Sequence, residues 1–463
     1  MLRALYDLAT WLAQPLLRRK LRRRGQAEPG YLQAVDERFG RYGAAPERPQ
    51  PADGAPLVWL HAVSLGETRA AAALLPALRA QWPGMRLLLT HGTATGRAEG
   101  AQLLQPGDAQ LWQPWDTRAA TRRFARRYRP DIGVLMETEV WPNLVRACAD
   151  EGVPLVLANA RLSDQSLRGA QRAGRLLKAA YAGLGAVWAQ TDQDADRLRQ
   201  LGAPVEGVLG NLKFDAQPSQ ALLAQGQAWR ARAGRPVLLL ASSREGEEAE
   251  FFKQIRALAG AESAPQAIEK EANEAIRPQW LVVPRHPQRF DEVAALAGQH
   301  GLTVGRRSQW ADGPEPADVW LGDSLGEMPA YYALADVALL GGSFAPLGGQ
   351  NLIEAAACGC PVLMGPHTFN FAQAAEQARA AGAAERVPDL AAALRRAQVL
   401  LADGAGRARM AEAGRAFARQ HQGAAARTAR AMALRVGAKG QHDATVAASP
   451  SCGDAPDGRS PAP

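Results

Sequence analysis

A Ser-Leu-Gly-Glu tetrapeptide occurs twice in the sequence, at residues 64–67 and 324–327. Each copy follows a short apolar run and stands at a predicted strand-to-helix turn. With this spacing, the serine can cap the helix by accepting the backbone N–H three residues on, while the glutamate accepts the cap residue's own backbone N–H. At the carboxyl end of the first strand of an open sheet, the same carboxylate faces the crevice where α/β proteins bind ligands. Glu67 is therefore also a candidate general base toward a hydroxyl group.

The second copy of the tetrapeptide fits another chemistry. Residues 322–326 read Gly-Asp-Ser-Leu-Gly, the pattern of the nucleophile turn in serine hydrolases. Such a serine requires histidine and acidic partners. The downstream histidines, His367, His421 and His442, stand in unrelated contexts. A serine hydrolase is kept as the weaker alternative.

Two further carboxylates, Glu137 and Glu139, directly follow another apolar run. Residues at i and i+2 point to the same side of an extended chain. Glu139 is the second candidate catalytic carboxylate, with Glu137 as the alternative. One of the two can instead be an ordinary charge at a helix entry.

Glycines and a Gln-Asn pair at residues 341–351 lead into an amphipathic helical stretch. Backbone N–H groups in such a loop can bind a phosphate, and a glutamate one turn into the helix can accept from ribose hydroxyls. The same glutamate can also simply stabilise the helix dipole. The candidate nucleotide-binding residues are Gly342, Ser343, Gly348, Gly349, Asn351 and Glu354.

Basic and imidazole groups stand near the ends of other apolar runs. Each alone is an ordinary surface group, but together they can form a positive crevice for a nucleotide phosphate. The residues of this second substrate-binding set are Lys213, Ser243, Arg244, Arg285 and His286. The sequence has no acidic cluster that suggests a metal site, and we expect neither a metal nor a cofactor.

Buried strands alternating with helices are the scaffold that these residues require. Apolar runs at 57–63, 86–90, 132–136, 155–158 and 187–190 are each followed by a helical stretch, and the rhythm restarts at 237–241, 280–283, 319–322, 337–340 and 362–364. This alternation predicts an α/β protein with two doubly wound, Rossmann-like domains. We expect these domains at residues 25–215 and 236–437, a linker at 216–235, a surface insertion at 259–278 and a disordered tail at 438–463.

Composition restricts the class of protein further. Four irregularly spaced cysteines in 463 residues fit neither a disulfide framework nor paired zinc ligands, and predict a reducing cytoplasm. The formal charge of +8 concentrates at residues 18–24, where six of seven positions are basic. The apolar run before this basic collar is interrupted and shorter than the roughly 20 residues that span a bilayer.

A helix at residues 1–24 is therefore expected to lie on anionic membrane lipids. A plain surface helix is the alternative to this membrane contact. No nucleic-acid recognition pattern recurs along the chain, so nucleic acid is not an expected partner.

Five segments, in this order, resemble the transferases that add 3-deoxy-octulosonic acid (Kdo) to lipid A precursors in Gram-negative lipopolysaccharide synthesis. They are HAVSLGE at 61–67, METEVWPN at 136–143, GNLKFD at 210–215, PRHPQRF at 284–290 and GGSFAPLGGQNLIEAAACGCPVLMGPH at 341–367. The similarity spans about residues 1–435. The 259–278 insertion and the C-terminal tail depart from the compact core of that family.

The resemblance implies a GT-B glycosyltransferase fold with an N-terminal membrane-associated helix on the cytoplasmic side of the inner membrane. It implies CMP-Kdo as donor on the C-terminal domain, lipid IVA as acceptor on the N-terminal domain, and an inverting, metal-independent reaction. Glu67 would be the general base, with Glu139 assisting. The residues implied to stabilise the departing CMP phosphate are Lys213, Arg244 and Arg285, and those implied to hold the nucleotide are Ser343, Gly348, Gly349, Asn351 and Glu354.

Other functions fit the same architecture, because a fold does not fix an activity. A hexosamine transferase and a nucleotide-sugar epimerase are alternatives within this class. An inactive peripheral membrane protein that only binds a nucleotide or a lipid is the alternative outside it.

Overall fold

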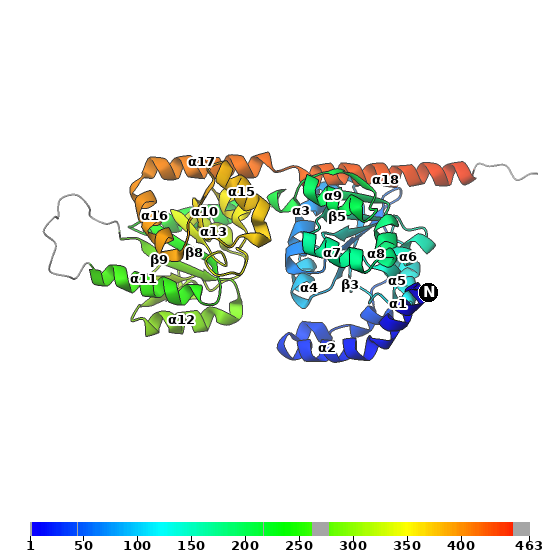
Figure 1. Cartoon of the computed structure of the whole chain (residues 1–463), viewed down its shortest axis with the longest axis horizontal. Coiled ribbons are helices and arrows are strands. Elements are labelled where there is room, and N and C mark those ends of the chain that lie inside the picture. Colours follow the sequence, from blue (N-terminus) through cyan, green and yellow to red (C-terminus); the bar gives the residue numbers. More distant parts are fainter. Residues whose placement is uncertain (1, 44, 216, 262–276, 448–463) are drawn as a thin grey trace, which may run out of the picture. The chain divides into compact units, whose positions relative to one another are not determined.

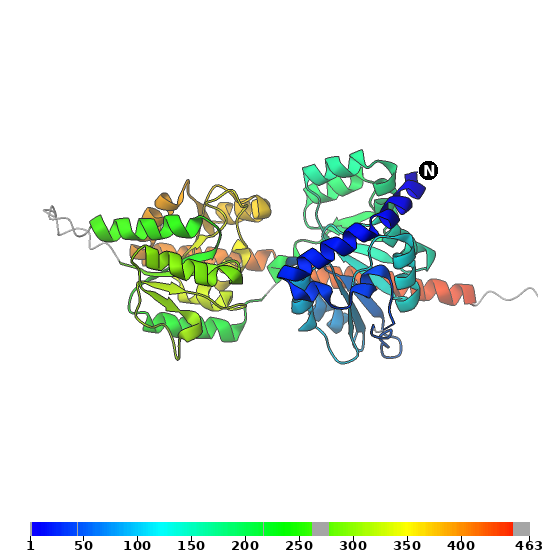
Figure 2. The ribbon, with the colours of Figure 1, turned by 90° about the horizontal axis from the view of Figure 1, so that it is seen from below.

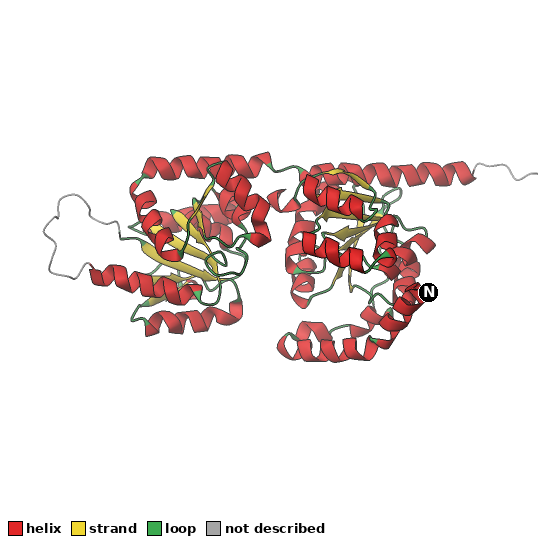
Figure 3. Ribbon diagram, in the orientation of Figure 1, coloured by secondary structure: helices red, strands yellow, loops and turns green. Residues whose placement is uncertain are grey.

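The computed structural model describes residues 2–43, 45–215, 217–261 and 277–447, and the chain divides into two compact units. Unit 1 comprises Met1–Asp215 and Gly423–Pro463, and unit 2 comprises Ala216–Gln422. In each unit, helices cover both faces of a central sheet (Figure 3). Both sheets are parallel throughout, so the predicted α/β fold with two doubly wound domains is confirmed.

The sheet of unit 1 has seven strands in the order β3-β2-β1-β4-β5-β6-β7. Its strands are β1 (Leu57–His61), β2 (Arg86–His91), β3 (Ala109–Trp112), β4 (Ile132–Met136), β5 (Leu155–Ala160), β6 (Ala186–Ala189) and β7 (Val205–Val208). Strands β1 and β4 are buried along their whole length, as expected for apolar strands covered on both faces. The strand order changes direction between these two neighbours, which places a ligand crevice at their carboxyl ends.

Helices of unit 1 follow the strands and pack on the two faces of the sheet (Figure 1). They are α3 (Leu65–Gln81), α4 (Ala94–Ala101), α5 (Arg118–Tyr128), α6 (Pro142–Asp150), α7 (Asp164–Arg172), α8 (Arg175–Ala182) and α9 (Asp192–Gln200). A serine or threonine side chain caps five of these helices by accepting a backbone N–H bond. The capping residue lies between the strand and the helix, so polar groups gather at the carboxyl edge of the sheet.

The predicted N-terminal helix is two helices, α1 (Leu2–Leu12) and α2 (Gln14–Ala27), which lie along one side of unit 1 (Figure 2). Helix α2 is anchored through buried Leu21, and Arg18 stacks 3.8 Å from the ring centroid of Phe39. Two 3-10 turns, η1 (Pro29–Leu32) and η2 (Val35–Phe39), complete this packing. Helix α1 buries none of its residues. Within the described residues, no helix combines the length and apolar character that crossing a bilayer requires.

The sheet of unit 2 has the strand order β10-β11-β9-β8-β12-β13-β14. Its strands are β8 (Val237–Ser243), β9 (Gln279–Pro284), β10 (Val304–Arg306), β11 (Val319–Leu321), β12 (Val337–Leu340), β13 (Val362–Met364) and β14 (Ala384–Arg386). Its helices are α10 (Gln220–Arg232), α11 (Glu247–Ala261), α12 (Phe290–Gln299), α13 (Met328–Leu334), α14 (Leu352–Cys358), α15 (Ala372–Ala380), α16 (Leu390–Ala402) and α17 (Gly404–Gln420). Leu240 and Leu339 of the central strands belong to one buried apolar core.

The observed boundaries of the units differ from the expected ones. The predicted linker at 216–235 contains α10, which packs on α13 inside unit 2. The chain leaves unit 2 after Gln422, not at residue 437, and continues as α18 (Ala424–Ala447), which packs on α3 of unit 1 (Figure 1). The carboxylate of Asp215 accepts the backbone N–H groups of Gly423 and Ala425 and so ties the two crossing segments together.

The predicted insertion and tail lie partly outside the described residues. Helix α11 ends at Ala261 and β9 begins at Gln279, and residues 262–276 between them are not described. The first ten residues of the predicted tail belong to α18, so a tail that starts at residue 438 is wrong for that part. Residues 448–463 lie outside the described residues.

Candidate active site

Glu67 lies in the first turn of α3, just past the carboxyl end of β1. Ser64 caps the helix by accepting the Glu67 N–H at 3.4 Å, and the Ser64 hydroxyl donates to Glu67 Oε1 at 3.1 Å. Glu67 Oε2 accepts the backbone N–H of Val63 at 2.8 Å, one residue before the cap. The serine half of the predicted capping contact is confirmed, but the Glu67 carboxylate accepts the N–H of Val63 and not the expected N–H of the cap residue Ser64. These bonds fix the carboxylate at the crevice.

The surroundings of Glu67 shift the pKa of its carboxyl group toward 7. Burial, together with the negative charges of Glu137 and Glu139, raises the pKa of Glu67 to about 7, although the Val63 N–H and the Ser64 hydroxyl act to lower it. Glu67 is 9% exposed. A carboxylate with such a pKa can take a proton from a hydroxyl near neutral pH.

Glu139 and Glu137 have different environments. Glu139 Oε2 accepts the indole N–H of Trp141 at 2.8 Å, and burial raises its pKa. Glu137 is 3% exposed, and its carboxylate binds two cations: Arg161 Nε lies 2.7 Å from Oε2 and Lys213 Nζ lies 3.2 Å from Oε1. The Glu137 carboxylate therefore holds two cationic side chains, Arg161 and Lys213, in place.

The sequence interpretation did not include Arg161 or the residue two positions before it, Asn159. Asn159, the penultimate residue of β5, has a left-handed backbone (φ +52°), and its Oδ1 accepts the Leu212 N–H at 3.0 Å. This bond fixes the turn that carries Lys213. The signal that could have found both residues is their position at the carboxyl end of a central strand.

In unit 2, the glycine-rich loop after β12 is held by a carboxylate that the sequence interpretation missed. Glu247, the first residue of α11, accepts the N–H groups of Gly342 at 2.7 Å, Phe344 at 3.1 Å and Ala345 at 3.3 Å. It also accepts the Arg244 N–H at 2.9 Å. Burial raises the pKa of Glu247, and these backbone bonds lower it. Several backbone donors that we expected at a phosphate therefore point at Glu247.

Two predicted ligand-binding serines make internal bonds. The fully buried Ser343 hydroxyl donates to the Leu340 carbonyl and accepts the Gly365 N–H. The equally buried Ser243 hydroxyl donates to Glu248 at 2.7 Å, and Glu248 pairs with Arg289. Both hydroxyls thus shape the loops, and a direct ligand contact for either stays a prediction.

Other predicted residues of the glycine-rich loop have local reasons for their type. Gly348 (φ +89°) and Gly349 (φ +73°) are left-handed, and a Cβ on Gly348 would collide with the Phe369 and Asn370 side chains. Asn351 Oδ1 accepts the Ile353 N–H at 3.1 Å and caps α14, in whose first turn Glu354 lies.

The structure brings two predicted basic groups and one predicted imidazole of unit 2, Arg244, Arg285 and His286, together at the ends of β8 and β9. The Arg285 N–H donates to the Ser243 carbonyl at 3.0 Å, which fixes the two strand ends side by side. Burial lowers the pKa of His286, and the positive charges of Arg244 and Arg285 lower it further. The expected positive cluster therefore exists in unit 2, whereas Lys213 belongs to unit 1.

Ser324 does not have the partners of a hydrolase nucleophile. Its hydroxyl lies at 2.5 Å from Glu327 Oε2 and from the Tyr331 hydroxyl, and Arg307 donates to Glu327 at 2.8 Å. A carboxylate and a phenol take the place of the imidazole that a serine nucleophile needs. The second Ser-Leu-Gly-Glu copy therefore forms a polar network in unit 2.

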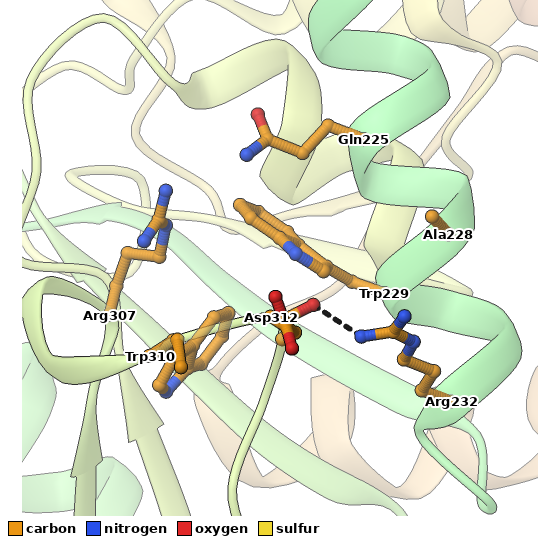
Figure 4. A pocket seen from close by; sticks show the side chains of 9 residues that line it. Gln225, Ala228, Trp229, Arg232, Arg307, Trp310 and Asp312 are labelled. Carbon is orange, nitrogen blue, oxygen red and sulfur yellow. Dashed lines mark hydrogen bonds between the residues drawn. The ribbon is translucent and has the colours of Figure 1, made fainter.

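Unit 2 also contains a pocket of about 280 Å³ beside this network (Figure 4). Trp229 and Trp310 meet edge to face in its wall, and the Arg307 guanidinium lies 4.7 Å from the Trp229 ring centroid. None of the predicted site residues lines this pocket. Throughout the described ranges, no group of three or more His, Cys, Asp or Glu side chains is placed to hold a metal ion.

The two units, each a parallel sheet with helices on both faces, have the GT-B fold found in glycosyltransferases. A glycosyltransferase from Rickettsia africae shares this fold with a TM-score of 0.53 and 12% identity, over 82% of this chain and 98% of that one.

Sequence similarity to other proteins identifies the family. Residues 33–216 match the family described as 3-Deoxy-D-manno-octulosonic-acid transferase (kdotransferase). The 3-deoxy-D-manno-octulosonic acid transferase of Bordetella pertussis is 51% identical over 92% of this chain and 97% of its own length. The 3-deoxy-D-manno-octulosonic acid transferase of Haemophilus influenzae is 32% identical over 92% of this chain and 96% of its own length. The chain belongs to the Kdo transferase family of lipopolysaccharide biosynthesis.

Proposed function

We propose that this protein transfers Kdo from CMP-Kdo to the lipid A precursor lipid IVA, with inversion and without a metal ion. The observation that carries the proposal is Glu67, a fixed carboxylate at the crevice of unit 1 with a pKa of about 7. It is the group best suited to deprotonate an acceptor hydroxyl.

In the proposed reaction, the acceptor oxygen attacks the anomeric carbon of Kdo while the bond from that carbon to the CMP phosphate breaks. Glu67 takes the proton of the acceptor hydroxyl, and CMP leaves with the bonding electron pair. Attack opposite the leaving group inverts the anomeric centre. Glu139 assists by lying near Glu67, whose pKa its charge helps to raise.

Unit 2 is proposed to bind the nucleotide of the donor. Arg244 and Arg285 supply positive charge at the ends of β8 and β9, and the neutral imidazole of His286 adds a hydrogen-bond donor, so a departing phosphate can be stabilised there. Gly342, Gly348 and Gly349 let the backbone of the next loop approach a ligand closely. Asn351 and Glu354 stand at the start of α14 and are proposed to contact the nucleoside.

Helix α1 is proposed to rest on the cytoplasmic face of the inner membrane, next to the lipid acceptor. Its large apolar side chains are exposed and the basic collar follows on α2, a combination typical of interfacial helices. The exposed apolar residues are Leu2, Leu5, Leu8, Trp11 and Leu12 of α1, followed by Leu16 in the first turn of α2.

A transfer assay tests the proposed function. Purified protein with fresh CMP-Kdo and lipid IVA is expected to release CMP, to label the lipid and to give a product of inverted anomeric configuration by NMR. We expect the rate to be the same with and without EDTA. Loss of activity in EDTA that Mg²⁺ restores would contradict metal independence. No labelling of the lipid would contradict the donor and acceptor assignment.

The pH dependence of the transfer rate follows from the acidity of Glu67. Below its pKa of about 7 the carboxyl group is protonated and cannot accept a proton, so kcat is expected to rise through neutral pH. Well below pH 7, the rate should fall about tenfold per pH unit. A stopped assay with saturating substrates from pH 5.5 to 9 measures this profile. A flat profile across this range would contradict the role of Glu67 as base.

A further inference from the structure

Arg161 and Lys213 meet at one buried carboxylate at the carboxyl edge of the unit 1 sheet. Both bind Glu137, at 2.7 Å and 3.2 Å, while their own side chains are 51% and 24% exposed. The buried Glu137 carboxylate thus holds two partly exposed cations, and the three side chains together carry a net charge of +1. Such a group suits an anion placed over this edge.

Backbone strain accompanies this arrangement. Glu137 (φ +58°) and Asn159 (φ +52°) adopt the left-handed conformation at the ends of neighbouring strands β4 and β5, which non-glycine residues do rarely and at a free-energy cost. Glu137 fixes the side chain of Lys213, and Asn159 fixes the backbone of the preceding Leu212. Strain of this kind is kept where a group must be held in one position.

If the proposed function is correct, the transferred sugar itself carries an anion that can bind Arg161 and Lys213. Kdo is an ulosonic acid, so its carboxylate is bonded directly to the anomeric carbon. That carbon must meet the acceptor hydroxyl beside Glu67. The charge of Glu137 raises the pKa of Glu67, so the two carboxylates are neighbours. Without adjacent cations, the sugar carboxylate would be repelled by Glu67, Glu137 and Glu139.

We propose that Arg161 and Lys213 bind the carboxylate of the transferred sugar and thereby select a carboxylated donor. The bond from Arg161 to Glu137 uses Nε, and the guanidinium has further N–H donors on its terminal nitrogens, in a geometry that suits a carboxylate. Glu137 and Asn159 act as positioning residues. Lys213 then has the sugar carboxylate, not the CMP phosphate, as its anionic partner.

Two sugar donors that differ only in the carboxylate measure its interaction with Arg161 and Lys213. CMP-Kdo and its uncharged C1 amide are compared as donors by kcat/KM, in the unsubstituted protein and in Arg161→Ala, Arg161→Lys and Lys213→Met. The intrinsic reactivity of the amide is the same for every variant and cancels. We expect Arg161→Ala and Lys213→Met each to reduce the preference for CMP-Kdo over the amide by about 10- to 100-fold, as for a lost hydrogen bond to a charged group. Arg161→Lys keeps the charge and is expected to lose less of the preference.

Controls separate recognition from folding. Arg199, a surface arginine of α9 with a side chain exposed to 53% and paired with Asp196, is the matched control, and Arg199→Ala should keep the full preference. Thermal unfolding shows which variants fold, and Arg161→Lys retains the ion pair if Arg161→Ala does not fold. Equal losses with both donors would overturn the inference, because a purely structural role lowers both alike. Absence of CMP-Kdo transfer by the unsubstituted protein would overturn the proposed function itself, and the inference with it.

Discussion

Glu67→Gln is expected to abolish Kdo transfer while the protein stays folded. The amide oxygen can still accept the Val63 N–H, so the helix cap survives, but an amide cannot take a proton from the acceptor. We expect kcat to fall by about 10² to 10⁴, the usual contribution of a general base. Incorporation of labelled Kdo measures the rate, and thermal unfolding measures the stability.

The second copy of the tetrapeptide provides the control for this prediction. Glu327 has the same sequence context, but its carboxylate binds Ser324 and Arg307 in unit 2. Glu327→Gln should keep most of the transfer activity. Similar losses for Glu67→Gln and Glu327→Gln would indicate that the motif acts only through structure. Substantial activity of Glu67→Gln would remove the carboxylate from the mechanism.

The sequence predicted the central strands better than the outer ones. Ten apolar runs were recognised, and each corresponds to a strand in the interior of one of the two sheets. The strands that were missed are β3, β7, β10 and β14, which are the four edge strands. An edge strand has a partner on one side only, and these are short or carry polar residues, as the alternating burial of β7 illustrates. Their apolar signal is therefore weak.

The return of the chain to unit 1 was not predictable from local patterns either. Alternation of strands and helices locates units but does not say which unit a terminal helix joins. The contacts that decide it are the packing of α18 on α3 and the bonds from Asp215 to Gly423 and Ala425, between segments far apart in the sequence. No periodicity in either segment encodes such a contact.

In the candidate site, too, positions along the strands were predictable from the sequence, whereas contacts between side chains were not. Strand-end position made Glu67, Lys213, Arg244 and Arg285 candidates, because the carboxyl edge of a parallel sheet can be predicted from the strand pattern. Which polar groups pair with one another depends on side-chain geometry. The sequence therefore missed that Glu137 is shared by Arg161 and Lys213.

The same limitation hid Glu247. The glycine-rich loop was recognised, and its N–H groups were expected at a ligand phosphate. The structure instead gives several of them to a carboxylate of α11. Substitution of Glu247 is therefore expected to affect both the stability of the glycine-rich loop and nucleotide binding.

Glu247→Ala is expected to destabilise unit 2 and to weaken CMP binding together. The substitution leaves the buried N–H group of Gly342, and the partly buried N–H groups of Phe344, Ala345 and Arg244, without their acceptor. An unsatisfied buried donor costs about 1 to 3 kcal/mol, and water entering the space recovers part of the total, so we expect a loss on the order of 3 kcal/mol. Thermal unfolding and calorimetric titration with CMP measure the two effects.

A neighbouring glutamate separates loop support from the general loss of an acidic residue on α11. Glu250 is partly exposed and pairs with Lys253, so Glu250→Ala should change neither stability nor CMP affinity appreciably. If the loop needs Glu247 to keep its shape, CMP affinity in Glu247→Ala should fall more than tenfold even at temperatures where the variant is folded. Unchanged CMP affinity in a folded Glu247→Ala protein would show that the nucleotide does not depend on this loop, and would move the proposed nucleotide site away from the glycines after β12.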